Sequence, residues 1–316
     1  MNKKMSISNI FKQYGTIISG IVIILIFSIL RPSSFATYSN FINITRQISL
    51  LVVISLGATL IMSVEEFDLS IGALASLGGV LAAKAAVANL PTVVCFVGAF
   101  IICLLIGYVN GWIVTKFKVL SFITTLAMST IIAGFTFWFT GGATVFENIP
   151  KEFGFIGSKS FLTIPLLSLL MVILVVVFWF IMKNTAFGRK LYAIGGNEEA
   201  ASVAGIKVKK YKNMAFALCA GMAGLAGMLM ASRLGSAHPN GGDGLFLQAY
   251  AAVFLGRTVF REGVPNIVGT FIGAIILGVL ANGLTILQVP TFMQDILTGL
   301  IIIIAVVAQK LGSDDK

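Results

Sequence analysis

Long apolar stretches separated by short polar ones run along almost the whole chain. An apolar run of about 17–25 residues can cross the hydrocarbon layer of a membrane as a helix. The pattern predicts ten spans, at residues 15–30, 43–64, 68–88, 91–115, 119–140, 162–182, 213–232, 245–260, 264–286 and 290–309. The eighth is short enough to be a partial or re-entrant helix, so we expect eight to ten. The runs lack the alternation of membrane β-strands, which favours an all-α polytopic membrane protein.

Composition and charge agree with this interpretation. Hydrophobic residues make up 58% of the chain, charged residues 11%, and the mean hydropathy is +1.00, so almost no sequence remains for a soluble catalytic domain. We therefore expect a single transmembrane domain over residues 1–316. The net charge of +10 comes from basic residues near span ends, such as Lys3, Lys4 and Lys12, which indicates membrane orientation and no nucleic-acid partner. Their distribution predicts cytoplasmic amino and carboxyl ends.

The longest polar interval is residues 183–212, which hold seven of the 22 basic residues. Asn197 can cap a helix, and the two glutamates that follow it would lie in the first turn, where the helix dipole favours negative charge. Gly205 can take the left-handed conformation that ends a helix. The pattern predicts a helix over residues 198–204 in a cytoplasmic loop. It fits an ordinary loop or a docking element for another protein. The segment of interest comprises Gly195, Gly196, Asn197, Glu198, Glu199, Ala200, Ala201 and Gly205.

Several polar residues lie within or near the ends of predicted spans. An ionisable group in lipid costs roughly 2.5–3.5 kcal/mol on insertion scales, so each such residue calls for a partner or a function. Asp68 or Ser70 can cap the third predicted span, and Asp295 lies about one turn inside the last. These polar residues could line a path for a polar solute. Alternatively, they could lie in solvated turns or form hydrogen bonds between helices. The candidates are Asp68, Ser70, Asn110, Gln248, Asn282 and Asp295.

Small residues recur at four-residue spacing in the predicted spans, which lets helices approach closely within the chain or between subunits. The pairs are Ala75 and Gly79, Ala223 and Gly227, Gly269 and Gly273, and Ala274 and Gly278. The sequence around Asn110-Gly111 is also echoed around Asn282-Gly283. The two copies fall in spans of opposite predicted direction, as an inverted repeat requires.

The chain shows no motif for chemistry of its own. The three cysteines, Cys95, Cys103 and Cys219, fall inside predicted spans and have no metal-ligand spacing, so we expect small buried side chains. A Walker A pattern and a zinc spacing are both missing from the sequence. We therefore expect no catalytic residue and no metal site, and any nucleotide hydrolysis would come from another chain.

Three blocks of the sequence are similar to one family. Phe67-Asp68-Leu69-Ser70-Ile71-Gly72 resembles its "IDLSVG" motif, and residues 188–206 resemble its "GR…ALGGNE-A…GI" motif. The third block is Ala251–Gly256 with residues 267–270 and 277–284. Together they resemble the permeases of bacterial ABC importers for ribose, xylose and similar sugars, within the binding-protein-dependent group that includes branched-chain amino acid permeases.

The resemblance implies that Asn197 to Gly205 is a coupling helix that docks on an ATPase subunit. That subunit would bind ATP and Mg, and this chain would need no cofactor. It also implies a second permease copy or a paralogue, an extracytoplasmic solute-binding protein, membrane lipid as surroundings, and location in the bacterial cytoplasmic membrane. The chain departs from the family at Glu65-Glu66, Gln248, Arg257 and Arg261, which leaves open another solute such as a furanone, a pentitol or a nucleoside.

Two other functional classes remain to be weighed. A self-sufficient secondary transporter would suit an inverted repeat, but it needs a coupling-ion site at the membrane midplane. Only Asp68 and Asp295 come close, and the span pattern places both near span ends. A membrane enzyme acting on lipid would need a convergent catalytic set, which the sequence does not offer.

Overall fold

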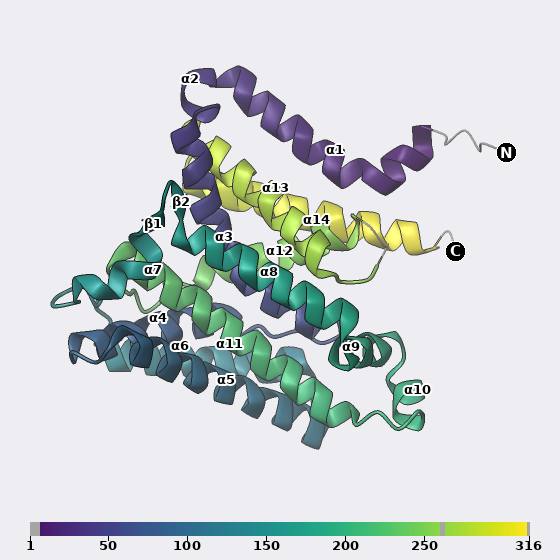
Figure 1. Ribbon diagram of the computed structural model, residues 1–316. Helices are drawn as coiled ribbons and strands as arrows, with labels where there is room; N and C mark the ends of the chain where they lie inside the picture. Colours follow the sequence, from purple (N-terminus) through teal and green to yellow (C-terminus); the bar gives the residue numbers. More distant parts are fainter. Residues whose placement is uncertain (1–6, 260–262, 315–316) are drawn as a thin grey trace.

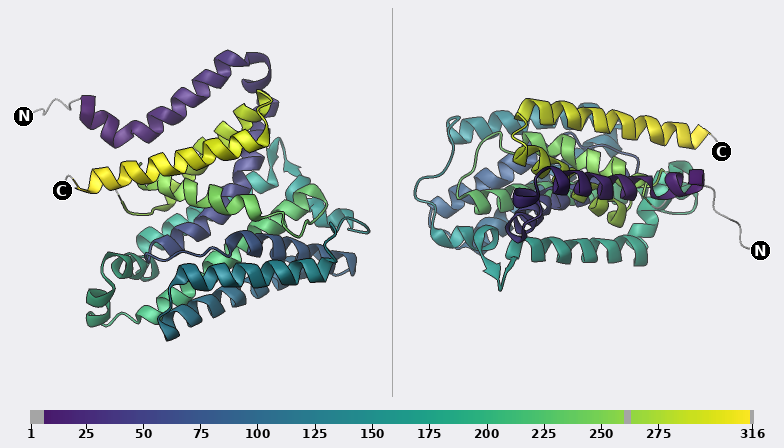
Figure 2. Two further views of the ribbon diagram at one scale, coloured as in Figure 1. Left: turned by 180° about the vertical axis from the view of Figure 1, so that it is seen from behind. Right: turned by 90° about the horizontal axis from the view of Figure 1, so that it is seen from above.

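The computed structural model describes residues 7–259 and 263–314, and nearly all of its regular secondary structure is helical (Figure 1). The expected all-α architecture is confirmed. The basic residues Lys3, Lys4 and Arg261, which entered the orientation argument or the family comparison, lie outside the described residues. The long helices lie roughly side by side and form one bundle (Figures 1 and 2).

The helices are α1 (Ile7–Leu30), α2 (Pro32–Phe35), α3 (Tyr38–Met62), α4 (Ile71–Val87), α5 (Thr92–Phe117), α6 (Ser121–Thr140), the 3-10 helix η1 (Lys151–Gly154), α7 (Phe155–Ser158), α8 (Leu166–Asn184), α9 (Ala186–Gly196), α10 (Glu198–Val203), α11 (Val208–Leu234), α12 (Asp243–Arg257), α13 (Ile267–Ile286) and α14 (Thr291–Asp314). Two short strands, β1 (Ser160–Phe161) and β2 (Ile164–Pro165), form an antiparallel pair.

Six of the described helices are long and apolar enough to cross a membrane: α3, α5, α6, α8, α11 and α13. Two shorter apolar helices are Thr16–Leu30 within α1 and the 17-residue α4. Helix α12 has only 15 residues, in agreement with the prediction of a partial eighth span. At 1.5 Å per residue, α4 and α12 reach about 25 and 22 Å, less than the roughly 30 Å of a hydrocarbon layer. The predicted spans therefore correspond to helices of different lengths, and α4 and α12 are too short to cross the hydrocarbon layer.

The bundle has two distinct ends. Helices α9 and α10, the first turns of α1 and the last turns of α14 lie at one end, which we call the α10 end (Figures 1 and 2). The β1–β2 pair, α2 and α7 lie at the other, the hairpin end (Figure 1). A bridge between Val145 and Ala237 joins two loops there. Both described chain termini are thus on the same side as the segment predicted to contact a partner.

The same order of elements occurs twice. In the first set, the long helix α3 is followed by a non-helical break at residues 63–70, the short α4, and then α5 and α6. In the second, the long α11 is followed by a break at residues 235–242, the short α12, and then α13 and α14. Helix α3 runs toward the α10 end, whereas α11 runs away from it (Figure 1). Asn110-Gly111 on α5 and Asn282-Gly283 on α13 occupy corresponding helices.

The second break packs against the first turns of α4 inside the bundle. A Cβ atom on Gly242 would lie 2.3 Å from the carbonyl oxygen of Gly72, so the first turns of α4 and α12 touch through backbone atoms. The Gly242 amide also donates to the Ser76 hydroxyl, at 2.9 Å. Residues 235–242 therefore descend from the hairpin end into the protein. His238 in this segment is exposed.

Small residues let α4 and α11 pack in direct backbone contact. A Cβ atom on Gly227 would come within 1.7 Å of the Ala75 carbonyl oxygen, and one on Gly78 within 2.6 Å of the Gly224 carbonyl oxygen. Gly273 approaches the Ala252 carbonyl in the same way, to 2.2 Å. The four-residue spacing of small side chains thus serves packing inside the chain. The three cysteines are buried and free, as predicted.

Candidate functional site

The predicted helix after Asn197 is present as α10. The Asn197 side chain accepts a hydrogen bond from the Ala200 amide at 2.8 Å, and Gly205 follows the helix with φ of +81°. Helix α10 lies beyond the ends of α8 and α11, outside the bundle (Figure 1). Glu199 and Ala200 are exposed, whereas Ala201 is buried. One face of α10 therefore packs on the protein and the other is open for contact.

The polar interval around α10 is more helical than the sequence analysis expected. Residues 186–196 form α9, which was missed, although Phe187, Leu191 and Ile194 have the spacing of one apolar helix face. The turn between α8 and α9 is tight, since a Cβ atom on Gly188 would lie 2.2 Å from the Met182 carbonyl oxygen. Helices α9 and α10 thus form one unit joined at Asn197, which ends the first helix and begins the second.

This α9–α10 unit contacts the break at residues 63–70. Gly195 packs against the chain there, because a Cβ atom on it would lie 2.3 Å from the Ser63 carbonyl oxygen. Gly196 faces open space. Glu198 of α10 accepts a hydrogen bond from Lys212 of α11 at 2.7 Å, and the same ammonium group donates to Glu66 at 2.7 Å. Glu198 is therefore bonded within the chain, although its side chain remains 55% exposed.

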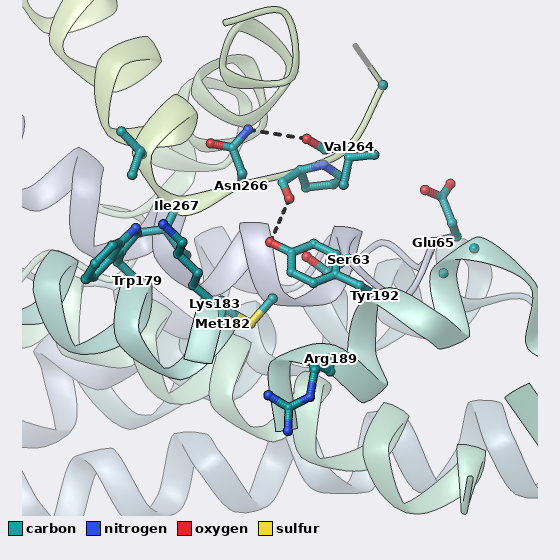
Figure 3. Close-up of a pocket in the computed structure, with 15 residues that line it drawn as sticks. Ser63, Glu65, Trp179, Met182, Lys183, Arg189, Tyr192, Val264, Asn266 and Ile267 are labelled. Atoms are coloured by element: carbon teal, nitrogen blue, oxygen red, sulfur yellow. Dashed lines mark hydrogen bonds between the residues drawn. The ribbon is translucent and has the colours of Figure 1, made fainter. Parts of the chain in front are cut away.

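A pocket of about 770 Å³ lies beside this unit, between α8, α9 and the chain that leads into α13 (Figure 3). Tyr192 closes one side by donating from its hydroxyl to the Pro265 carbonyl at 3.0 Å. The Lys183 ammonium lies 5.0 Å from the centre of the Trp179 ring, a cation–π contact. Asn266 caps α13 by accepting from the Gly269 amide at 2.7 Å. The pocket gives the α9–α10 unit an open flank.

Three of the candidate pathway residues form one buried cluster. Asp68 accepts hydrogen bonds from the amide and the hydroxyl of Ser70, and the Asn110 amide nitrogen donates to the same hydroxyl at 3.1 Å. All three side chains are fully buried. The second Asp68 carboxyl oxygen and the Asn110 carbonyl oxygen have no hydrogen-bond partner among the described residues. Asp68 lies three residues before α4, at a helix end as predicted, but the break carries it into the buried interior of the bundle.

Gln248 and Asp295 come together elsewhere. Both line a cavity of about 200 Å³ between α12, α13 and α14, with Thr291, Gln294 and Thr298 as further polar neighbours. Asp295 is exposed and Gln248 is half-buried.

Asn282 belongs to neither group. Its side chain and that of Asn40 exchange two hydrogen bonds of 3.0 Å, which join α13 to α3. Both amides are buried. Of the two interpretations of Asn282, the structure favours an interhelical connection. Asn40 was missed, and its position near a predicted span start gave no signal for it.

Lys212 and Tyr250 were also missed. In the sequence Lys212 is one of seven basic residues at positions 183–212, but in the structure it is 8% exposed and carries two ion pairs. The Tyr250 hydroxyl accepts from the Asp68 amide at 2.8 Å and donates to the Asp68 carbonyl at 3.1 Å. Each joins residues far apart in the chain, which a single sequence does not reveal. Among the described residues, no group of three or more metal-ligating side chains occurs.

Comparison with known proteins places the chain among transport permeases. The family described as "Branched-chain amino acid transport system / permease component" matches residues 40–306. The ribose import permease of Bacillus subtilis is 37% identical over 313 residues, covering 98% of this chain and 97% of that protein. The ribose import permease of Escherichia coli K12 is 38% identical over 301 residues, covering 94% of each.

A D-allose transport system permease of Escherichia coli K12 is 33% identical over 312 residues, covering 98% of this chain and 95% of that protein. No solved structure matches the chain. The family match covers both breaks, the α9–α10 unit and every candidate residue discussed above. The chain is a multi-pass membrane protein that belongs to this family of transport-system permeases.

Proposed function

We propose that this chain is the membrane-spanning subunit of an ATP-driven importer in the bacterial cytoplasmic membrane, and that its solute is a sugar. Two relatives that match over nearly their full length are named as ribose permeases and a third as a D-allose permease. The proposal takes D-ribose as the first solute to test. The departures at Glu65, Glu66 and Gln248 leave room for another small polar solute.

The observation that carries the proposal is the α9–α10 unit. A short capped helix is marginal by itself in water, yet this one is placed outside the bundle with an exposed acidic face. Such a helix suits docking in a groove of an ATPase subunit, which would bind ATP and Mg and move the unit on closure. In this proposal Glu199 and Ala200 face the ATPase, while Glu198 stays bonded to Lys212.

The solute path, in the same proposal, follows the recess that holds Gln248 and Asp295. Amide, hydroxyl and carboxylate groups match the hydroxyl groups of a sugar. The neighbouring surface of α14 is strongly apolar, with Phe292 62% exposed and Ile296 52% exposed. A second permease copy, the same chain or a paralogue, would cover this surface and complete the path. A solute-binding protein would deliver the sugar at the hairpin end.

The topology follows from this assignment. With the α10 end in the cytoplasm, α1 and α14 begin and end on the cytoplasmic side, and ten predicted spans give both termini the same location. The twofold order of long helix, break, short helix and two further helices then forms an inverted repeat. Each break contacts the short helix of the other set, and in this proposal a two-state rearrangement of α4 and α12 opens the path to either side.

The test is co-purification of the chain with its ATPase subunit from detergent. A Glu199→Lys exchange reverses an exposed charge without touching an internal ion pair of the described structure, and we expect it to reduce the bound ATPase at least tenfold. Glu152→Lys, which reverses the charge of another exposed glutamate near the hairpin end, is the matched control and should retain the ATPase. If the natural protein purifies without an ATPase and uses an ion gradient to accumulate D-ribose, the chain is a secondary transporter instead.

A further inference from the structure

Lys212 stands at a junction of three elements. It projects from α11, its side chain is 10% exposed, and its ammonium group lies 2.7 Å from both Glu66 and Glu198. The Glu66 side chain is 16% exposed and the Glu198 side chain 55%, so the bond to Glu66 is the better shielded of the two. A shielded ion pair is weakened less by water and salt than an exposed one. Lys212 thus ties α10 to residues 63–70.

A second contact joins the same two parts. Gly195 of α9 lies against the backbone at Ser63, with no room for even a methyl group. The α9–α10 unit therefore packs directly on the first residue of the break and is connected to its fourth residue, Glu66, through Lys212 of α11. The pocket of about 770 Å³ lies beside this contact, because Ser63, Gly195 and Gly196 all line it.

The break passes these contacts on to other helices. The Phe67 amide donates to Ser121 of α6 at 3.4 Å, and the Leu69 amide donates to Thr125 of α6 at 2.9 Å. Asp68 exchanges two backbone hydrogen bonds with the Tyr250 hydroxyl of α12. The amides of these three residues lie outside regular helix, so each needs a partner on another helix. The position of the break determines whether that partner is within reach. A displacement of residues 63–70 reaches α6 and α12 directly.

We propose that Lys212 is the positioning residue that transmits the displacement of α10 to residues 63–70, and through them to α4 and α12. The inference deepens the proposed function and rests on it. Lys212 contacts neither ATP nor solute. It holds Glu66 and Glu198 on one ammonium group, so that when the ATPase moves α10 the break follows. Transmission depends on the bond between Lys212 and Glu66. Without it, the bond between Lys212 and Glu198 would connect α10 only to α11.

The experiment separates transmission from docking. In Glu66→Met the ammonium group keeps Glu198 as its partner, so no buried charge is left unpaired. Hydrogen–deuterium exchange of the complex with its ATPase is compared without nucleotide and with a non-hydrolysable ATP analogue. In the natural complex we expect the analogue to change exchange in both residues 198–203 and residues 63–70. In Glu66→Met we expect the change at 198–203 to persist and that at 63–70 to disappear.

Transport gives a second readout. D-ribose import per ATP hydrolysed, measured in vesicles with the binding protein, should fall at least tenfold in Glu66→Met while ATP hydrolysis continues. A Lys212→Met, Glu66→Met double variant should import no less D-ribose per ATP than Glu66→Met, since both changes remove the same link between α11 and the break. Lys212→Arg should retain coupling. Lys210→Met is the matched control, because Lys210 is exposed on the same helix and has no ion pair within the described structure.

Three results would overturn the inference. They are a normal response of residues 63–70 in Glu66→Met, loss of the ATPase subunit from that variant, and an equal defect in Lys210→Met. If the natural chain itself binds no ATPase, the proposed function fails first and this inference falls with it.

Discussion

The contact between α4 and α11 at Gly227 makes a quantitative prediction. In Gly227→Ala the new methyl carbon would lie 1.7 Å from the Ala75 carbonyl oxygen and 2.5 Å from the carbonyl carbon. An ordinary contact between such atoms is about 3.5 Å, so the helices would have to part by more than 1 Å. That movement would also break the neighbouring contact, in which a Cβ atom on Gly78 would lie 2.6 Å from the Gly224 carbonyl oxygen. Overpacking of this kind typically costs about 1–3 kcal/mol.

The assay is thermal unfolding of the purified protein in detergent. We expect Gly227→Ala to lower Tm by roughly 2–8 °C, from the usual relation between stability and Tm. Gly134→Ala is the matched control, because a Cβ atom at this helical position of α6 has no described atom within 4 Å. Alanine is favoured over glycine in a helix by up to about 1 kcal/mol, so Tm of the control should stay or rise. Equal Tm values for Gly227→Ala and the natural protein would refute the backbone contact.

Three further predictions concern the polar residues. Asn40→Leu and Asn282→Leu should each lower the free energy of unfolding by about 1 kcal/mol, and the double variant by less than their sum, because each single change orphans the partner amide; additive losses would contradict the pairing. Asp68→Ala should cost roughly 1–3 kcal/mol in the same unfolding assay, because the buried Ser70 amide and the Ser70 hydroxyl proton lose their acceptor. Gln248→Leu and Asp295→Asn should slow D-ribose import at least fivefold while the ATPase still co-purifies, and unchanged import would remove this recess from the path.

Much of the architecture could be predicted from local sequence. Apolar runs located most of the membrane helices, and the cap and the left-handed glycine at either end of α10 are local signals, so its limits were found within a residue. Small residues at four-residue spacing likewise act within one helix face. These features share a property: the groups that determine them are close together in the chain.

The features that sequence did not reveal depend on distant groups. Hydropathy treated Asp68 as a residue near a span end, because the break that buries it is stabilised by Tyr250, some 180 residues later. The role of Lys212 depends on Glu66, 146 residues away. Helix α9 is the exception. The spacing of its apolar residues is a local signal for a helix, but it lies in a basic interval and the helix was not predicted. Which polar residues share a recess, such as Gln248 and Asp295, follows only from the packing of α12 against α14.

The break at residues 63–70 also constrains how the chain is made. Its amide groups at Phe67 and Leu69 find partners on α6, but the amide and carbonyl of Asp68 bond to Tyr250, which is synthesised much later. Unpaired backbone groups in lipid cost several kcal/mol each. A nascent chain that has emerged only through α6 therefore lacks the partner that stabilises its own break. The first half of the bundle must wait at the insertion machinery, or near the water interface, until α12 arrives, so assembly is completed late and chains truncated before α12 should be substrates for membrane proteases.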